Sequence, residues 1–122
     1  MGYRDLIREI QDASGLSPRE SREVLDNTVE SLASLLDDEE REEFASQLPS
    51  ELQYVALDAE PINGHSRTDL LSQFVERQQV DEDEARTLIG TAWQAIKDAL
   101  SGGEANYIRS QLPGRSADLL TS

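Results

Sequence analysis

The chain has 122 residues, of which 25 are acidic and 11 basic, giving a formal net charge of −14, and it contains no cysteine. This length suits one domain or two very small ones, and the lack of cysteine excludes disulfides, thiolate zinc sites and cysteine nucleophiles. The charge argues against free DNA or RNA as a partner, because phosphate contacts need clustered cations. No apolar run is long enough for a transmembrane span or a signal peptide, so we expect a cytoplasmic protein.

Arginine provides nearly all of the positive charge, since Lys97 is the only lysine among the 11 basic residues. Many carboxylates with almost no lysine are typical of proteins kept soluble in concentrated salt, where charge repulsion is screened within ~3 Å at ~1 M. This composition indicates a halophilic archaeon as the source, and an ordinary acidic mesophile is the alternative. Residues 1–61 hold 16 acids and 5 bases (−11), whereas residues 62–122 hold 9 acids and 6 bases (−3).

The spacing of apolar residues predicts three helices in the first part of the chain. The first covers about residues 3–13 and stops near Gly15. The second opens at Ser17, whose hydroxyl can accept a hydrogen bond from the backbone N–H of Glu20. The Glu20 side chain can in turn accept one from the backbone N–H of Ser17, as in a capping box. The third opens in the same way at Asp37 and ends at Pro49. Their apolar faces are Tyr3, Leu6, Ile7 and Ile10; Val24, Leu25, Thr28, Val29, Leu32, Leu35 and Leu36; and Phe44, Ala45 and Leu48.

A fourth, short helix is indicated over residues 52–57, and a linker over 58–66 contains the turn residues Pro61 and Asn63-Gly64. Helices of the second part are predicted to begin at Ser66 or Thr68, at Asp81 and at Ser101. Leu119-Leu120 corresponds to a curtailed fourth helix. No segment alternates strictly between apolar and polar residues as a strand would, so the prediction is an all-α protein.

The pattern repeats itself without gaps, so that residues 3–57 align with residues 67–121. Such a repeat predicts two tandem three-helix units, related by a pseudo-twofold rotation and packed as one six- to seven-helix bundle domain over residues 1–122. The identical positions are Asp5/Asp69, Leu6/Leu70, Glu20/Glu84, Arg22/Arg86, Leu36/Leu100, Glu40/Glu104 and Ser46-Gln47-Leu48-Pro49 on Ser110-Gln111-Leu112-Pro113.

These residues resemble a known family. Glu20-Ser21-Arg22 and Glu84-Ala85-Arg86 in the long helices, together with the two Ser-Gln-Leu-Pro segments, are similar to the DUF2267 family over essentially the whole chain. The resemblance implies a fold, because these motifs pack and cap helices. The family is by name a domain of unknown function, so it implies no catalytic or binding residues. The linker Ile62-Asn63-Gly64-His65 departs from the aromatic-containing segment expected there.

No candidate for chemistry stands out, and we predict no catalytic, cofactor-binding or metal-binding residues. His65 is the only histidine and lies in the linker, without partners at catalytic spacing. The acidic clusters 37–43 and 81–84 could attract Mg²⁺ or Ca²⁺, but both fall where helix N-termini favour negative charge. Ser46-Gln47 and Ser110-Gln111 could contact a partner, or could simply lie beside the packed Leu48 and Leu112. Gly102-Gly103 fits a turn between helices, and Trp93 aligns with Val29 as a core residue.

The leading functional hypothesis is a non-enzymatic helical module, adapted to high salt, that binds another protein or itself in grooves between helices. The alternatives are an acidic mimic of nucleic acid that binds a basic protein through the −11 half, and an enzyme that uses carboxylates alone. We expect no membrane partner, because the polar faces of the helices are acidic and repel anionic lipid.

Salt should control stability. Because 25 carboxylates share a small surface with few cations, the thermal midpoint should rise steadily as KCl increases toward ~1 M, where repulsion is screened. Calorimetry across a KCl series measures this. A midpoint that is flat between dilute buffer and molar salt would contradict the halophilic interpretation.

Overall fold

The computed structural model describes residues 2–59, 70–112 and 114–120. These residues form eight helices and no strand, which confirms the all-α prediction. None of the described helices is long and apolar enough to cross a membrane. The helices are α1 (Tyr3–Ser14), α2 (Pro18–Ser34), α3 (Asp38–Ser46), α4 (Ser50–Asp58), α5 (Leu70–Gln78), α6 (Glu82–Ala99), α7 (Gly102–Gln111) and α8 (Gly114–Asp118).

The number of helices differs from the predicted six to seven because the last segment of the chain is not fully curtailed. The short helix α8 forms just before Leu119-Leu120, and Leu120 is fully buried. The other described boundaries lie close to the predicted ones, including those of α4, which was expected over residues 52–57. The predicted helix start at Ser66 or Thr68 lies outside the described residues.

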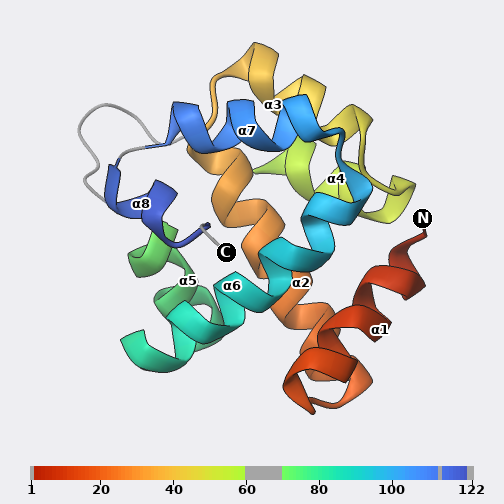
Figure 1. Ribbon diagram of the computed structural model, residues 1–122, viewed down its shortest axis with the longest axis vertical. Helices are drawn as coiled ribbons and strands as arrows, with labels where there is room; N and C mark the ends of the chain where they lie inside the picture. The colour runs from red at the N-terminus through yellow and green to blue at the C-terminus, as the bar shows by residue number, and fades with distance from the viewer. Residues whose placement is uncertain (1, 60–69, 113, 121–122) are drawn as a thin grey trace.

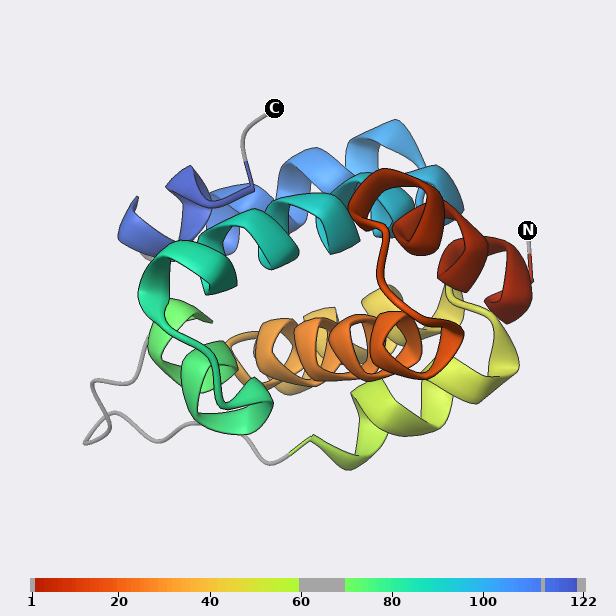
Figure 2. The ribbon, with the colours of Figure 1, turned by 90° about the horizontal axis from the view of Figure 1, so that it is seen from below.

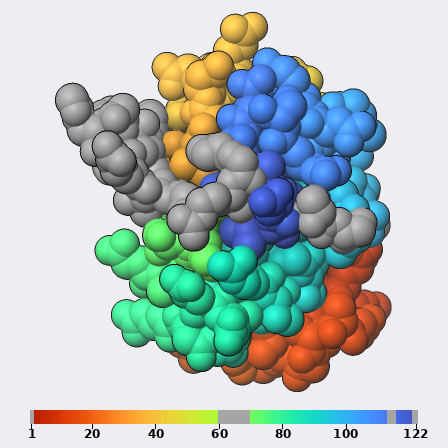
Figure 3. All heavy atoms as spheres, turned by 60° about the vertical axis from the view of Figure 1, so that its left-hand side comes forward, coloured from red at the N-terminus to blue at the C-terminus, as the bar shows by residue number. Residues whose placement is uncertain are grey.

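The two long helices, α2 and α6, form the middle of the molecule and pack against each other (Figure 1). Helix α1 packs against both of them, and so does α5. Figure 2 shows α1 near one end of this pair and α5 near the other. Helices α3 and α7 contact each other along one edge, as the space-filling view in Figure 3 also shows.

One hydrophobic cluster draws side chains from both parts of the chain. Its largest member is Trp93, which is fully buried, as is Val29, the residue that aligns with it in the first part of the chain. The prediction that Trp93 belongs to the core is therefore confirmed. Other fully buried side chains at aligned positions are Leu6/Leu70, Ile10/Phe74, Leu25/Ile89, Leu32/Ile96 and Phe44/Ile108.

Four helices begin with the predicted side-chain caps. The Ser17 and Ser101 hydroxyls accept hydrogen bonds from the backbone N–H groups of Glu20 and Glu104, each at 3.1 Å. The Asp37 and Asp81 carboxylates accept from the N–H groups of Glu40 and Glu84, each at 2.8 Å. Each cap satisfies a backbone donor that the helix itself leaves without a partner.

The ends of α1 and α5 share an unusual backbone conformation. Gly15 follows α1 with φ of 75°, and Gln79 follows α5 with φ of 58°. The two residues occupy aligned positions of the two parts of the chain. In this left-handed region a Cβ atom crowds the backbone at a cost of roughly 1–2 kcal/mol, which glycine avoids. The helix stop near Gly15 was predicted from its glycine, whereas Gln79 adopts the same turn without one.

Glycine substitutions at these two positions should therefore have opposite effects. Gln79→Gly should raise the free energy of unfolding by about 0.5–1 kcal/mol, because relief of the left-handed strain exceeds the added entropy of the unfolded chain. Gly15→Ala should lower it by about 1 kcal/mol, although a Cβ there would meet nothing within 4 Å. Urea unfolding of both variants measures this. If Gln79→Gly is destabilising, left-handed strain does not explain this turn.

Candidate functional site

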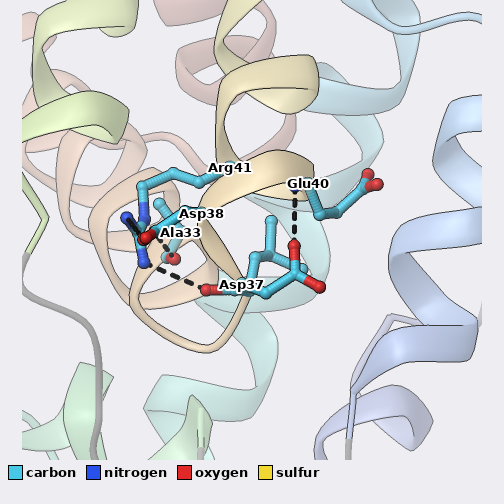
Figure 4. Close-up of polar contacts among 6 residues, drawn as sticks. Ala33, Asp37, Asp38, Glu40 and Arg41 are labelled. Atoms are coloured by element: carbon cyan, nitrogen blue, oxygen red, sulfur yellow. Dashed lines mark hydrogen bonds and ion pairs between the residues drawn. The ribbon is translucent and has the colours of Figure 1, made fainter.

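The acidic clusters seen in the sequence lie at helix N-termini. Asp37 caps α3 and Asp81 caps α6, and the acids that follow them occupy the first helical turns. Figure 4 shows Asp37 accepting the hydrogen bond from the Glu40 backbone, while the Glu40 side chain extends away from it. In the described part of the chain, no group of three or more histidine or acidic side chains is arranged to hold a metal ion.

The predicted Ser-Gln pairs have different surroundings in the two halves. The Gln47 side chain bridges to α7: its Oε1 accepts from the backbone N–H of Ser101 at 2.8 Å, and its Nε2 donates to Glu104 at 3.3 Å. Gln111, at the aligned position, is exposed. Leu48 and Leu112 are both buried, which agrees with the packing interpretation of these segments. Gln47 thus serves an internal contact between α3 and α7.

Two buried carboxyl groups meet at this same contact. Glu40 of α3 and Glu104 of α7 are each only 6% exposed, and each has one Oε1 atom that is buried without a hydrogen-bond donor among the described residues. Burial raises the pKa of Glu40 to about 8, helped by a hydrogen bond with Glu104 and by the negative charges of Glu104, Asp37 and Glu43. Protonation of Glu40 avoids placing a second negative charge beside that of Glu104.

A second carboxyl pair joins α1 to α6. Burial, a hydrogen bond with Asp98 and the charge of Asp98 raise the pKa of Glu9 to about 7, and the charge of Asp5 adds to this. Both pairs connect an element of the first half with one of the second. At each of these contacts one carboxyl has a raised pKa and faces another acidic side chain.

Two arginines are used inside the fold. Arg41 is 7% exposed and donates to the carbonyls of Ala33 at 3.1 Å and Leu36 at 3.0 Å, which closes the C-terminal end of α2 (Figure 4). Its guanidinium also pairs with Asp38 at 2.9 Å. Arg77 of α5 reaches α2, where it pairs with Glu30 at 3.3 Å and donates to the Ser31 hydroxyl at 3.0 Å.

Four further arginines line one groove. A groove of about 500 Å³ runs between α1 and the start of α2, and its lining is Arg4, Ile7, Arg8, Gln11, Pro18, Arg19 and Arg22. The first four of these residues follow the helical spacing of neighbours on one face of α1. Ile7 and Pro18 provide apolar surface between the charged groups. The four guanidinium groups are therefore concentrated in one place on a protein of net charge −14.

Three of these four arginines form no ion pair within the described residues. Arg19 pairs with Glu23 at 3.4 Å, with its own side chain 84% exposed. Among the residues that the structure describes, Arg4, Arg8 and Arg22 have no carboxylate within ion-pair distance. The charge of Arg22 does act on the neighbouring Asp26, which accepts a hydrogen bond from the Tyr3 hydroxyl at 2.7 Å and so ties α1 to α2.

The sequence alignment of residues 3–57 with residues 67–121 provides an internal comparison for this groove. In the alignment of the two halves, Arg8 corresponds to Ser72, Pro18 to Glu82 and Arg19 to Asp83, and Arg22 has a basic counterpart, Arg86. Helices α5 and α6 pack against each other although three of the four arginines are replaced in the aligned sequence, since Arg4 corresponds to Thr68. Helix packing at this position therefore does not require the full positive charge of the groove.

Sequence reasoning did not predict this groove. The sequence does indicate that Arg4, Ile7 and Arg8 share one face of α1. It does not indicate how closely the start of α2 approaches this face of α1. The only histidine, His65, was expected to lie exposed in the linker, and it falls outside the described residues.

The fold and the groove define an all-helical acidic protein with a local basic groove between two helices. A family model described as an uncharacterized conserved protein, DUF2267, matches residues 3–119. The chain belongs to the DUF2267 family. No curated protein and no solved structure matches it significantly.

Replacing Glu40 by glutamine should flatten the dependence of stability on pH. A carboxyl whose folded pKa is raised from 4.5 to about 8 stabilises the fold while it is protonated, and this contribution is lost as the pH rises through that range. Wild-type protein should therefore lose stability between about pH 5 and pH 9. Glu40→Gln should lose less, since its amide cannot ionise and can donate to Glu104. Urea unfolding at fixed ionic strength measures both.

Glu39→Gln is the matched control, because Glu39 is exposed on the same helical turn and its substitution removes the same charge. This variant should leave the pH dependence close to that of the wild type. Equal flattening by the two variants would show that general charge repulsion, rather than the buried pair, sets the pH dependence.

Proposed function

We propose that this protein is a non-enzymatic interaction module and that a segment of another protein docks in the groove between α1 and α2. The observation that carries the proposal is the groove itself, where apolar surface and a cluster of arginines lie open between two helices. Grooves between helices are a common docking place for segments of partner proteins. The comparison with Ser72, Glu82 and Asp83 supports a role for these arginines other than packing.

Several features support a non-enzymatic role over a carboxylate-only enzyme. The cap carboxylates of Asp37 and Asp81 are engaged by backbone N–H groups. Glu40 and Glu104 are buried between α3 and α7 rather than placed in an open pocket. The acidic-mimic alternative has less support, because the groove places a basic surface on the more acidic half.

We also propose that the chain is a tandem repeat adapted to high salt. The repeat is supported by helix starts at aligned positions, Pro18 with Glu82 and Asp38 with Gly102, and by the left-handed Gly15 and Gln79. Helices α1 and α5 each pack on both long helices, α2 and α6, which fits a twofold relation between the two halves of the chain. Adaptation to salt rests on the carboxylate excess and the single lysine.

Photo-cross-linking inside cells tests where a partner docks. A photoreactive amino acid at Gln11, which lines the groove and is partly exposed, should give a discrete covalent adduct with a protein. The control is the same substitution at Asn106, an exposed position on α7. An adduct from Gln11 and none from Asn106 is the expected result. The absence of a specific adduct at Gln11 would contradict the proposal.

A further inference from the structure

We infer that the segment recognised by the groove between α1 and α2 is rich in carboxylates and also carries apolar side chains. This inference rests on the proposed function and names the chemistry of the partner. It follows from three properties of the groove: the concentration of arginines without ion pairs in the described part of the chain, the placement of their charges, and the apolar surface between them.

The first property is charge concentration. The chain has 11 basic residues, and four of them, Arg4, Arg8, Arg19 and Arg22, line this one groove. With 25 carboxylates on the chain, each of these arginines could have had an acidic neighbour. Three of the four instead form no ion pair within the described residues. An arginine in this state can form paired hydrogen bonds with an incoming carboxylate.

The second property is the geometry of the positive charges. Arg4 and Arg8 are one turn apart on α1, about 6 Å along the helix axis, and Arg19 and Arg22 are nearly one turn apart on α2. Charges distributed along two helices suit several carboxylates on one chain better than one compact anion.

The start of α2 does not resemble a phosphate site. Phosphate binding at a helix N-terminus uses free backbone N–H groups. Here the Ser17 hydroxyl already occupies the N–H of Glu20 at 3.1 Å, and Pro18 has no N–H to offer. Few backbone N–H groups are therefore left at this helix start, so a ligand in the groove would be bound mainly by side chains.

The third property is apolar surface within the groove. Ile7 and Pro18 lie between the arginines, and Ile7 is partly buried against the core. A partner that combines glutamate or aspartate with leucine-like side chains would cover both kinds of surface. Its apolar contacts would also keep the complex together in concentrated salt, where ion pairs are weakened.

A direct binding measurement tests the inference. The probe is a short fluorescent peptide of glutamate and leucine, added to the full chain and followed by fluorescence anisotropy. Arg8→Gln/Arg22→Gln should weaken its binding by about tenfold, which corresponds to ~1.4 kcal/mol. Arg86→Gln/Arg109→Gln is the matched control, since it removes the same charge from residues outside the groove, and its affinity should equal that of the wild type. Equal losses in both double variants would overturn the inference.

Competing ligands have their own readouts. If a peptide with lysine in place of glutamate binds equally well and cross-links to Gln11, the acidic specificity is wrong while the proposed docking function stands. If inorganic phosphate displaces the acidic peptide at millimolar concentration, the groove is a phosphate site, and the inference is overturned.

If sedimentation shows self-association that Arg8→Gln/Arg22→Gln abolishes, the occupant is a second copy, and a separate acidic partner is excluded. If neither peptide nor any cellular protein reaches Gln11, the inference and the proposed function both fail.

Discussion

The scarcity of positive charge is the constraint on which this structure depends. With 25 acidic and 11 basic residues, the fold cannot give each carboxylate a cation. Many acids are placed at helix N-termini, where the backbone itself favours negative charge. Where a carboxyl lies buried or partly buried between the halves, as at Glu40 and Glu9, it meets another carboxyl and its pKa is raised toward neutrality or beyond. Two arginines, Arg41 and Arg77, are used where helices join.

The groove between α1 and α2 is an exception to this scarcity of positive charge. Four arginines gather there, and three of them have no ion-pair partner in the described part of the chain. Aligned positions of the second half carry Ser72 and Asp83 in place of Arg8 and Arg19, although α5 and α6 also pack together. Although basic residues are few in this protein, several arginines without an ion-pair partner in the described residues lie at this one site. That distribution is the physical basis for proposing a binding function there.

The sequence was sufficient for the all-α class and for most of the described helix starts, because helical periodicity and capping are local signals. Ser17, Asp37, Asp81 and Ser101 begin their helices as predicted, and the apolar faces form the core. The candidate site depends instead on how separate helices approach each other. Gln47 and Ser101 meet across a long stretch of chain, and so do Glu40 and Glu104. No local sequence pattern encodes either of these two contacts between distant residues. Both glutamates were predicted only as partners in capping boxes.

Carboxyl groups of the two halves lie side by side where Glu40 contacts Glu104 and Glu9 contacts Asp98, and burial raises the pKa of Glu40 and of Glu9 there. Carbon-13 NMR of the side-chain carboxyl carbon of Glu40 tests this claim most directly, because its chemical shift follows protonation of that one group. We expect a titration near pH 8 in the folded protein, well above the ordinary value of 4.5. A titration of the Glu40 carboxyl at its ordinary value would contradict the claim, since Glu40 would then be ionised at neutral pH beside the negative charge of Glu104.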